Sequence, residues 1–172
     1  EVDPQICNGL TIWSGPDSDN HGISLFSDSS VVHLNYTFSV DDYSNHGGQI
    51  VWRGNDGTDW EIYLYNGSTM IQLTDNAYDD ANPHIHGEQI VWDGYDGNDY
   101  EIYLYNGSTV TRLTNNSYND TIPLIHDGQI VWNGYDGNDY EIFMYNGSTV
   151  AQLTNNSHDD MDPLIHGGQA AW

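Results

Sequence analysis

The chain has 172 residues, of which 26 are acidic and two are basic, so its formal net charge at pH 7 is −24. A charge of this sign and size repels nucleic acids and anionic lipids, so neither is expected as a partner. No apolar run is long enough to cross a membrane, and the single cysteine excludes a disulfide within the chain.

Four short apolar runs follow one another in the first 42 residues, at positions 4–7, 10–13, 23–26 and 31–34. They are separated by turn residues, and none shows the i, i+3, i+4, i+7 spacing of a helix, so we predict strands. The same order of runs returns after residue 43, at first weakly, and then twice in a very regular form.

The third copy shows what one unit contains. Its predicted strands are Pro83–His86, Gln89–Asp93, Tyr100–Asn106 and Ser108–Thr114. Apolar and polar residues alternate in them with period 2, as in a β-strand. Asn106 and Gly107 are typical of a two-residue type I′ hairpin, and Pro83 begins the first strand, where its missing N–H does no harm.

One sheet of four strands cannot bury apolar groups on both of its faces unless neighbouring sheets stack against it. Tryptophan marks the period of 40 residues at positions 52, 92, 132 and 172. Four short antiparallel strands in a unit of this length are typical of a β-propeller blade. We therefore predict an all-β protein with a single propeller domain over residues 1–172. Its four blades and final half-blade are predicted at 3–42, 43–82, 83–122, 123–162 and 163–172.

Residues 163–172 repeat the first two strands of a blade and then stop. This would leave an unpaired strand edge, which folded proteins normally avoid. We expect the natural chain to continue into a longer protein; the alternative is that this half-blade docks on a neighbouring copy. Because Glu1 is not a methionine, we also expect a mature or excised piece whose targeting peptide is gone.

Each regular unit carries an acidic hairpin loop, and in the third unit Asp93, Asp96, Asp99 and Glu101 fall within nine residues. Calcium takes several oxygen ligands from a tight loop that contains glycine, so these loops are candidate calcium sites. The simpler interpretation is that the aspartates only form the turn by accepting backbone N–H groups. The candidate ligands are Asp56, Asp59, Glu61, Asp96, Asp99, Glu101, Asp136, Asp139 and Glu141.

Histidine recurs at one position per unit, and cysteine takes its place in the first. If the first strand of each blade is innermost, as in propellers generally, these side chains form a ring near the axis. Such a ring could bind zinc or copper, or each side chain could make the same structural hydrogen bond. The residues are Cys7, His46, His86, His126 and His166.

Aromatic residues lie in or after the acidic loops, at Trp60, Tyr95, Tyr100, Tyr135 and Tyr140. Beside Asp and Asn they could stack on sugar rings, but they could equally fill the space between blades. A second acidic group lies between successive units and is expected to form an Asx turn. It consists of Asp79, Asp80, Asn119, Asp120, Asp159 and Asp160.

Several asparagines stand in Asn-x-Ser/Thr triplets, which accept N-linked glycans in a glycosylating host. They are Asn35, Asn66, Asn106, Asn115, Asn119, Asn146 and Asn155. At Asn66, Asn106 and Asn146 the Asn-Gly turn explains the residue without any sugar.

The sequence contains no nucleophile elbow, no zinc-protease motif and no phosphate-binding glycine loop. Nearly identical blades also offer the same groups several times, whereas catalysis needs an asymmetric pocket. We therefore predict that this segment is not an enzyme and that Ca²⁺ is the one cofactor to consider.

The run P-x-I-x-G-x-Q-I-V-W, followed by D-G-x-D-x-E-I-Y-L-Y and x-Q-L-T, resembles the tandem propeller repeats of TolB-like prokaryotic proteins. It is most similar to repeats in bacterial and archaeal cell-surface proteins. The resemblance is strong over residues 47–166 and weak over 3–46. It implies four-stranded blades around an axis and a binding or scaffolding role outside the cytoplasm, and it carries over no catalytic residue.

Together these observations predict a non-enzymatic propeller, extracellular or at the cell surface, that acts in adhesion or as a scaffold through its repeated surfaces. Its partner would be a protein or a glycan at the cell surface. One alternative is an extracellular fibre in which Pro163–Trp172 of each copy docks end to end on the next. Another is a lectin with one sugar site per blade.

Overall fold

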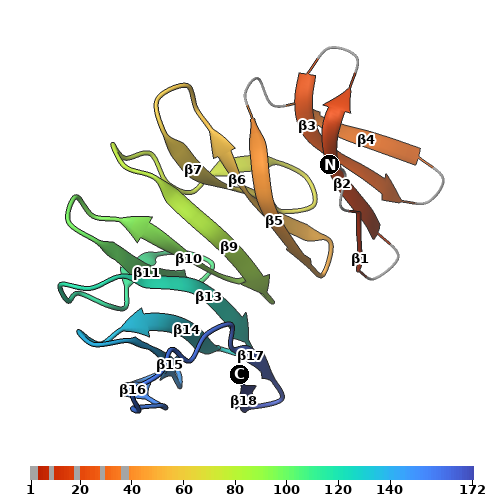
Figure 1. Cartoon of the computed structure of the whole chain (residues 1–172). Helices are drawn as coiled ribbons and strands as arrows, with labels where there is room; N and C mark the ends of the chain where they lie inside the picture. Colours follow the sequence, from red (N-terminus) through yellow and green to blue (C-terminus); the bar gives the residue numbers. More distant parts are fainter. Residues whose placement is uncertain (1–3, 8–9, 18–19, 28–29, 36–38) are drawn as a thin grey trace.

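The computed structural model describes residues 4–7, 10–17, 20–27, 30–35 and 39–172, and these ranges contain strands and no helix. The strands form four sheets of four and a final two-stranded hairpin. The sheets lie one after another in a fan, from the N-terminal sheet to the C-terminal hairpin (Figure 1). The prediction of an all-β propeller fold built from four-stranded antiparallel units is confirmed.

Each sheet is an antiparallel meander in sequence order. The first contains β1 (Gln5–Cys7), β2 (Leu10–Asp17), β3 (Asn20–Ser27) and β4 (Ser30–Asn35). The second contains β5 (Val40–His46), β6 (Gln49–Asn55), β7 (Trp60–Tyr65) and β8 (Met70–Gln72). The third contains β9 (Asp80–His86), β10 (Gln89–Tyr95), β11 (Tyr100–Tyr105) and β12 (Val110–Arg112). The fourth contains β13 (Asp120–His126), β14 (Gln129–Tyr135), β15 (Tyr140–Tyr145) and β16 (Val150–Gln152), and the hairpin contains β17 (Leu164–His166) and β18 (Gln169–Ala171).

The inner strands are longer than the sequence predicts. Strand β9 begins at Asp80 and not at Pro83, because pairing with β10 resumes beyond an irregularity in the ladder opposite Val91 and Asp93. Asn82 lies in this irregularity with φ 51°, in the left-handed region that asparagine tolerates. The outer strands are shorter than predicted: β12 covers only Val110–Arg112, at the exposed edge of its sheet.

The core consists of one apolar cluster at each junction between two four-stranded sheets. Neighbouring residues of a strand point to opposite faces, so Ile90 packs toward the second sheet and Val91 toward the fourth. Each junction also buries one tryptophan, Trp52, Trp92 or Trp132. Burial of one Ile, Leu or Val side chain contributes roughly 1.5–3 kcal/mol, so each sheet is stabilised chiefly by its neighbours.

A buried hydrogen bond ties this tryptophan to the start of the inner strand. Trp92 Nε1 donates to Asp80 Oδ1 at 3.0 Å, and Trp132 Nε1 donates to Asp120 Oδ1 at 2.8 Å. In the second sheet Val40 takes the place of the aspartate. Trp52 Nε1 is consequently buried without a partner among the residues that the structure describes.

We expect the substitution Trp92→Phe to cost more stability than Trp52→Phe. Both remove a similar apolar volume, but only the first leaves a buried carboxyl oxygen without its donor, which costs roughly 1–3 kcal/mol. Urea unfolding of the two variants measures the difference. Equal losses would show that the Trp92–Asp80 hydrogen bond contributes nothing to the blade junction.

Candidate functional site

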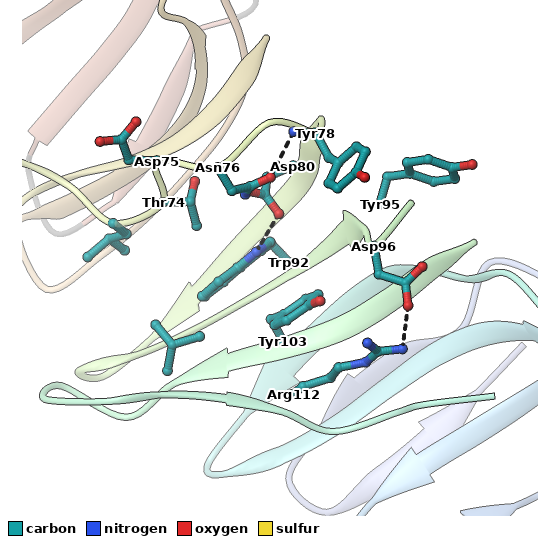
Figure 2. A pocket seen from close by; sticks show the side chains of 12 residues that line it. Thr74, Asp75, Asn76, Tyr78, Asp80, Trp92, Tyr95, Asp96, Tyr103 and Arg112 are labelled. Carbon is teal, nitrogen blue, oxygen red and sulfur yellow. Dashed lines mark hydrogen bonds and ion pairs between the residues drawn. The ribbon is translucent and has the colours of Figure 1, made fainter. Parts of the chain in front are cut away.

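The junction between the second and third sheets contains a hollow of about 490 Å³ (Figure 2). The loop of residues 73–80, which leaves the second sheet, forms one wall of the hollow. The third sheet forms the other wall with Tyr95, Asp96, Tyr103 and Arg112. Aromatic rings and charged groups therefore meet in one open pocket between two blades.

A chain of hydrogen bonds fixes the position of this loop. Glu61 Oε1, on β7, accepts from the backbone N–H of Asn76 at 2.8 Å. Asn76 Nδ2 donates in turn to Asp80 Oδ2 at 2.7 Å, and Asp80 holds the indole of Trp92. The chain thus connects β7 of one sheet to β10 of the next through two carboxyl groups.

The same chain recurs at the following junction with Glu101, Asn116, Asp120 and Trp132. Burial raises the pKa of Glu61 to about 7, and it raises the pKa of Asp120 to about 6. Each of these carboxyls also faces a second carboxyl across the chain, Asp80 or Glu101, which raises its pKa further. Asp80 and Asp120 were expected to form an Asx turn. They instead accept hydrogen bonds that connect neighbouring blades.

The acidic hairpin loops bring their carboxylates together as the spacing suggested. Oxygens of Asp96, Asp99 and Glu101 lie within 4.8 Å of one another, and so do oxygens of Asp136, Asp139 and Glu141. In the second sheet the group consists of Asp56, Glu61 and Asp75, so Asp59 is not a member of it. The sequence reasoning missed Asp75. The signal that could have identified it is that the equivalent positions in the next two units, 115 and 155, hold asparagine.

The first aspartate of each loop also forms the turn, as the simpler interpretation proposed. Asp96 Oδ1 accepts from the backbone N–H groups of Asn98 at 2.8 Å and of Asp99 at 3.2 Å. These bonds lower the pKa of Asp96, and equivalent bonds lower the pKa values of Asp56 and Asp136. Since one oxygen suffices for the turn, the other remains available for a cation.

Arg112 distinguishes the third sheet from its neighbours. Its Nη2 lies 2.6 Å from Glu101 Oε1 and 2.8 Å from Asp96 Oδ2, and its Nε donates to Thr114 O at 2.7 Å. The equivalent positions in the second and fourth sheets hold glutamine. The sequence reasoning counted Arg112 only toward the net charge; its difference from the equivalent glutamines was the signal that could have identified it.

Asp93 does not join the acidic loop that follows it. It is buried on the inner side of the sheet, where its Oδ1 accepts from Asn82 Nδ2 at 2.9 Å and from Ile122 N at 3.0 Å. Burial raises its pKa to about 7. The equivalent Asn133 makes a similar bond through Oδ1 to the backbone N–H of Asp162 at 3.0 Å.

The repeated histidines lie side by side at the ends of the inner strands. Successive ring centroids of His46, His86, His126 and His166 are 4.3, 4.3 and 4.5 Å apart. His86 Nδ1 accepts from the backbone N–H of Asp127 at 3.1 Å, a structural role. His86, His126 and Asp127 could offer ligand atoms within 4.8 Å of one another, and a metal there stays a prediction. The side chain of Cys7 lies outside the described residues.

Tyrosines line two smaller grooves at successive junctions. In one groove, of about 330 Å³, Tyr95 lies 5.6 Å from Tyr78 and 5.4 Å from Tyr100, measured between ring centroids. The groove of about 370 Å³ at the next junction repeats this arrangement with Tyr118, Tyr135 and Tyr140. The rings therefore pack on one another and still present open faces beside Asp59, Asp79, Asp99 and Asn119.

The glycosylation candidates Asn66, Asn106, Asn115, Asn119, Asn146 and Asn155 are exposed, whereas the side chain of Asn35 lies outside the described residues. At the Asn-Gly turns the asparagine accepts local backbone bonds, for example Asn106 Oδ1 from Ser108 N at 3.0 Å. The turn explains these residues, and glycosylation stays a prediction. No helix in the described ranges could span a membrane.

No family model matches this sequence, and no curated protein matches it. Solved structures, however, share its fold. The β-propeller domain of the trilobed protease from Pyrococcus furiosus is 13% identical, with a TM-score of 0.74 over 90% of this chain and 54% of that chain. Acylaminoacyl peptidase from Pyrococcus horikoshii is 16% identical, with a TM-score of 0.75 over 90% of this chain and 27% of that chain.

TolB from Acinetobacter baumannii is also similar, at 19% identity and a TM-score of 0.63 over 90% of this chain and 43% of that chain. The chain has a TolB-like β-propeller fold, in agreement with the resemblance of its repeats. It spans little more than half of the trilobed-protease propeller and about a quarter of the acylaminoacyl peptidase.

These comparisons correct the functional prediction. The similar structures include the propeller domain of a protease and two peptidases. The prediction of a non-enzymatic adhesion or scaffold module was wrong, and the fibre and lectin alternatives are set aside with it. The error arose because near-identical blades suggested one repeated binding surface, whereas a propeller can also serve a catalytic domain elsewhere in the molecule.

We expect Asp93→Asn to remove part of the pH dependence of stability. Unfolded Asp93 loses its proton near pH 4, but folded Asp93 keeps it to about pH 7. Folding therefore takes up a proton in this range, and the free energy of unfolding falls as the pH rises. This rise in pKa from about 4 to about 7 corresponds, at about 1.4 kcal/mol per pKa unit, to an upper bound of roughly 4 kcal/mol. The variant should therefore be more stable than wild type at pH 8 by up to this amount and about equal at pH 4.

Urea unfolding at several pH values measures this effect. Asn133→Asp is the matched control, because it places a carboxyl group at the equivalent position and should lower stability at pH 8 but not at pH 4. Parallel pH profiles for wild type and Asp93→Asn would contradict the assignment.

Proposed function

We propose that this chain is a section of a β-propeller that accompanies a peptidase domain, where it binds polypeptide and contributes no catalytic nucleophile. The observation that carries the proposal is the fold likeness to the propeller domain of a protease, which extends over 90% of the chain. Likeness to a puromycin-hydrolysing peptidase from Mycobacterium tuberculosis, with a TM-score of 0.66, supports it further. The partner would be a peptidase domain, in the same or another chain.

The grooves at the blade junctions suit peptides with basic side chains. Each offers tyrosine faces beside acidic or amide groups, which together attract an arginine or lysine side chain. The second sheet shows this contact within the protein: the Arg53 guanidinium lies 4.5 Å from the ring centroid of Trp60, at the position equivalent to Tyr100. A net charge of −24 would also speed the approach of cationic chains.

The proposed setting is outside the cytoplasm, in a prokaryotic envelope or at its surface. The resemblance of the repeats to those of TolB-like surface proteins supports it, as does a sequence with many Asn, Gly, Ser, Tyr and Trp residues and no lysine. In this setting the propeller would hold polypeptide substrates, and cleavage would occur in the accompanying domain.

We expect the protein to bind fluorescein-labelled basic peptides without cleaving them. Fluorescence anisotropy at low salt should give affinities at least about tenfold higher for a basic than for an acidic peptide of equal length, and salt should reduce the difference. Tyr118→Ala should weaken binding, because it removes an exposed ring face from the groove.

Tyr118→Phe is the matched control, since it keeps the ring face and should retain the affinity. The proposal fails if no peptide binds, or if Tyr118→Ala binds as tightly as wild type. Analysis of the peptides by mass spectrometry after incubation checks that they remain intact.

A further inference from the structure

One neighbouring position distinguishes the acidic loop of the third sheet from those of the second and fourth. In the third sheet the neighbour is Arg112, and in the second and fourth it is Gln72 or Gln152. Each loop gathers oxygens of three acidic side chains within 4.8 Å, and in the second sheet Asp75 takes the place of the residue equivalent to Asp99. The third sheet therefore has an arginine side chain beside its carboxylates, and the second and fourth sheets have an uncharged glutamine there.

In the third sheet the guanidinium of Arg112 bridges two of the three carboxylates. One nitrogen, Nη2, contacts carboxylate oxygens of both Glu101 and Asp96, at 2.6 and 2.8 Å. Glu101 is fully buried, so its charge needs a partner in place of water. Arg112 supplies that partner, and Figure 2 shows its guanidinium joined to the carboxylate of Asp96.

In the fourth sheet the same carboxylates have no such cation. Gln152 Nε2 reaches Asp136 Oδ2 only at 3.4 Å and carries no charge. Glu141 is also fully buried; its Oε1 accepts one backbone N–H, and its Oε2 has no partner within the described part of the chain. Asp139 Oδ1 is likewise buried and unpaired among those residues. In the third sheet Glu101 Oε2 and both oxygens of Asp99 are also buried without a hydrogen-bond partner in the described ranges, so the fourth sheet differs from it in lacking the cation. Buried carboxylate oxygens without a partner require a cation or a proton.

In the second sheet Gln72 likewise stands where the third sheet has Arg112. Glu61 is fully buried, and its Oε2 lacks a partner among the residues described. Asp75 completes the group where the equivalent positions carry asparagine. An added acidic residue beside an unpaired buried carboxylate increases the affinity for a cation.

The ligand set indicates which cation. Both groups offer only carboxylate oxygens, the hard ligands that calcium prefers, and include no sulfur or imidazole ligand that would favour zinc or copper. The Asp-Gly turn leaves one oxygen of Asp56 and of Asp136 outside its own hydrogen bonds. Waters and loop carbonyls can complete the six to eight ligands that calcium takes.

We propose that the acidic loops of the second and fourth blades each bind one calcium ion, through Asp56, Glu61 and Asp75 and through Asp136, Asp139 and Glu141. In the third blade Arg112 occupies the place of the ion. The function would be structural: calcium would join β7 to the loop of residues 73–80 in the second blade, and it would hold the hairpin between β14 and β15 in the fourth. The inference is independent of peptide binding.

Equilibrium dialysis with radioactive calcium, in 150 mM KCl and excess magnesium to suppress diffuse binding to an acidic surface, tests the proposal. Wild type should take up two ions per chain and should melt several degrees higher in calcium than in chelator. Arg112→Gln should take up three ions, because it restores the glutamine of the other blades. Gln152→Arg should take up one, because the new guanidinium fills the fourth-blade site.

Gln152→Leu is the matched control: it alters the same side chain without adding charge and should still bind two ions. If Arg112→Gln does not fold, as circular dichroism would show, Gln152→Arg and its control still decide the question. Binding that does not saturate, or equal stoichiometry in wild type and Gln152→Arg, would overturn the proposal.

Discussion

Burial of both faces of every inner sheet holds this protein together. A four-stranded sheet that carries Ile90 toward one neighbour and Val91 toward the other exposes apolar surface unless both neighbours are present. Stability therefore comes from junctions more than from single blades, as in other repeat proteins. Since the loops and pockets lie at these junctions, the chemistry of the molecule is located there as well.

The junctions are unusual because they combine this apolar burial with buried carboxyl groups. Glu61 and Asp80 stand at one junction, and Glu101 and Asp120 at the next, each pair linked through an asparagine. Burial of a carboxylate is unfavourable unless donors or cations compensate for it. Backbone N–H groups, an indole and, in one blade, a guanidinium provide that compensation, so the polar chain fixes how one blade sits against the next.

Function in such an array depends on departures from the repeat. Identical blades offer the same surface several times, whereas Arg112, Asp75 and Arg53 each occur in one blade only. Arg112 supplies a cation to the acidic loop of the third blade, and Asp75 adds a carboxylate to that of the second. Arg53 covers the ring of Trp60. The propeller domain of a protease that shares this fold shows that such a scaffold can be part of a catalytic protein. The peptide binding that we propose would use the tyrosine grooves.

The sequence by itself determined the strands, the hairpin turns and the period of 40 residues, because alternation and turn chemistry are local properties. It also located the acidic loops, since their carboxylates lie within a few residues of one another. It did not reveal that β9 begins at Asp80, that Asp75 joins Asp56 and Glu61, or that Arg112 neutralises Glu101. Those contacts join residues from different strands and loops, and only the ladder register and the stacking of the sheets bring them together.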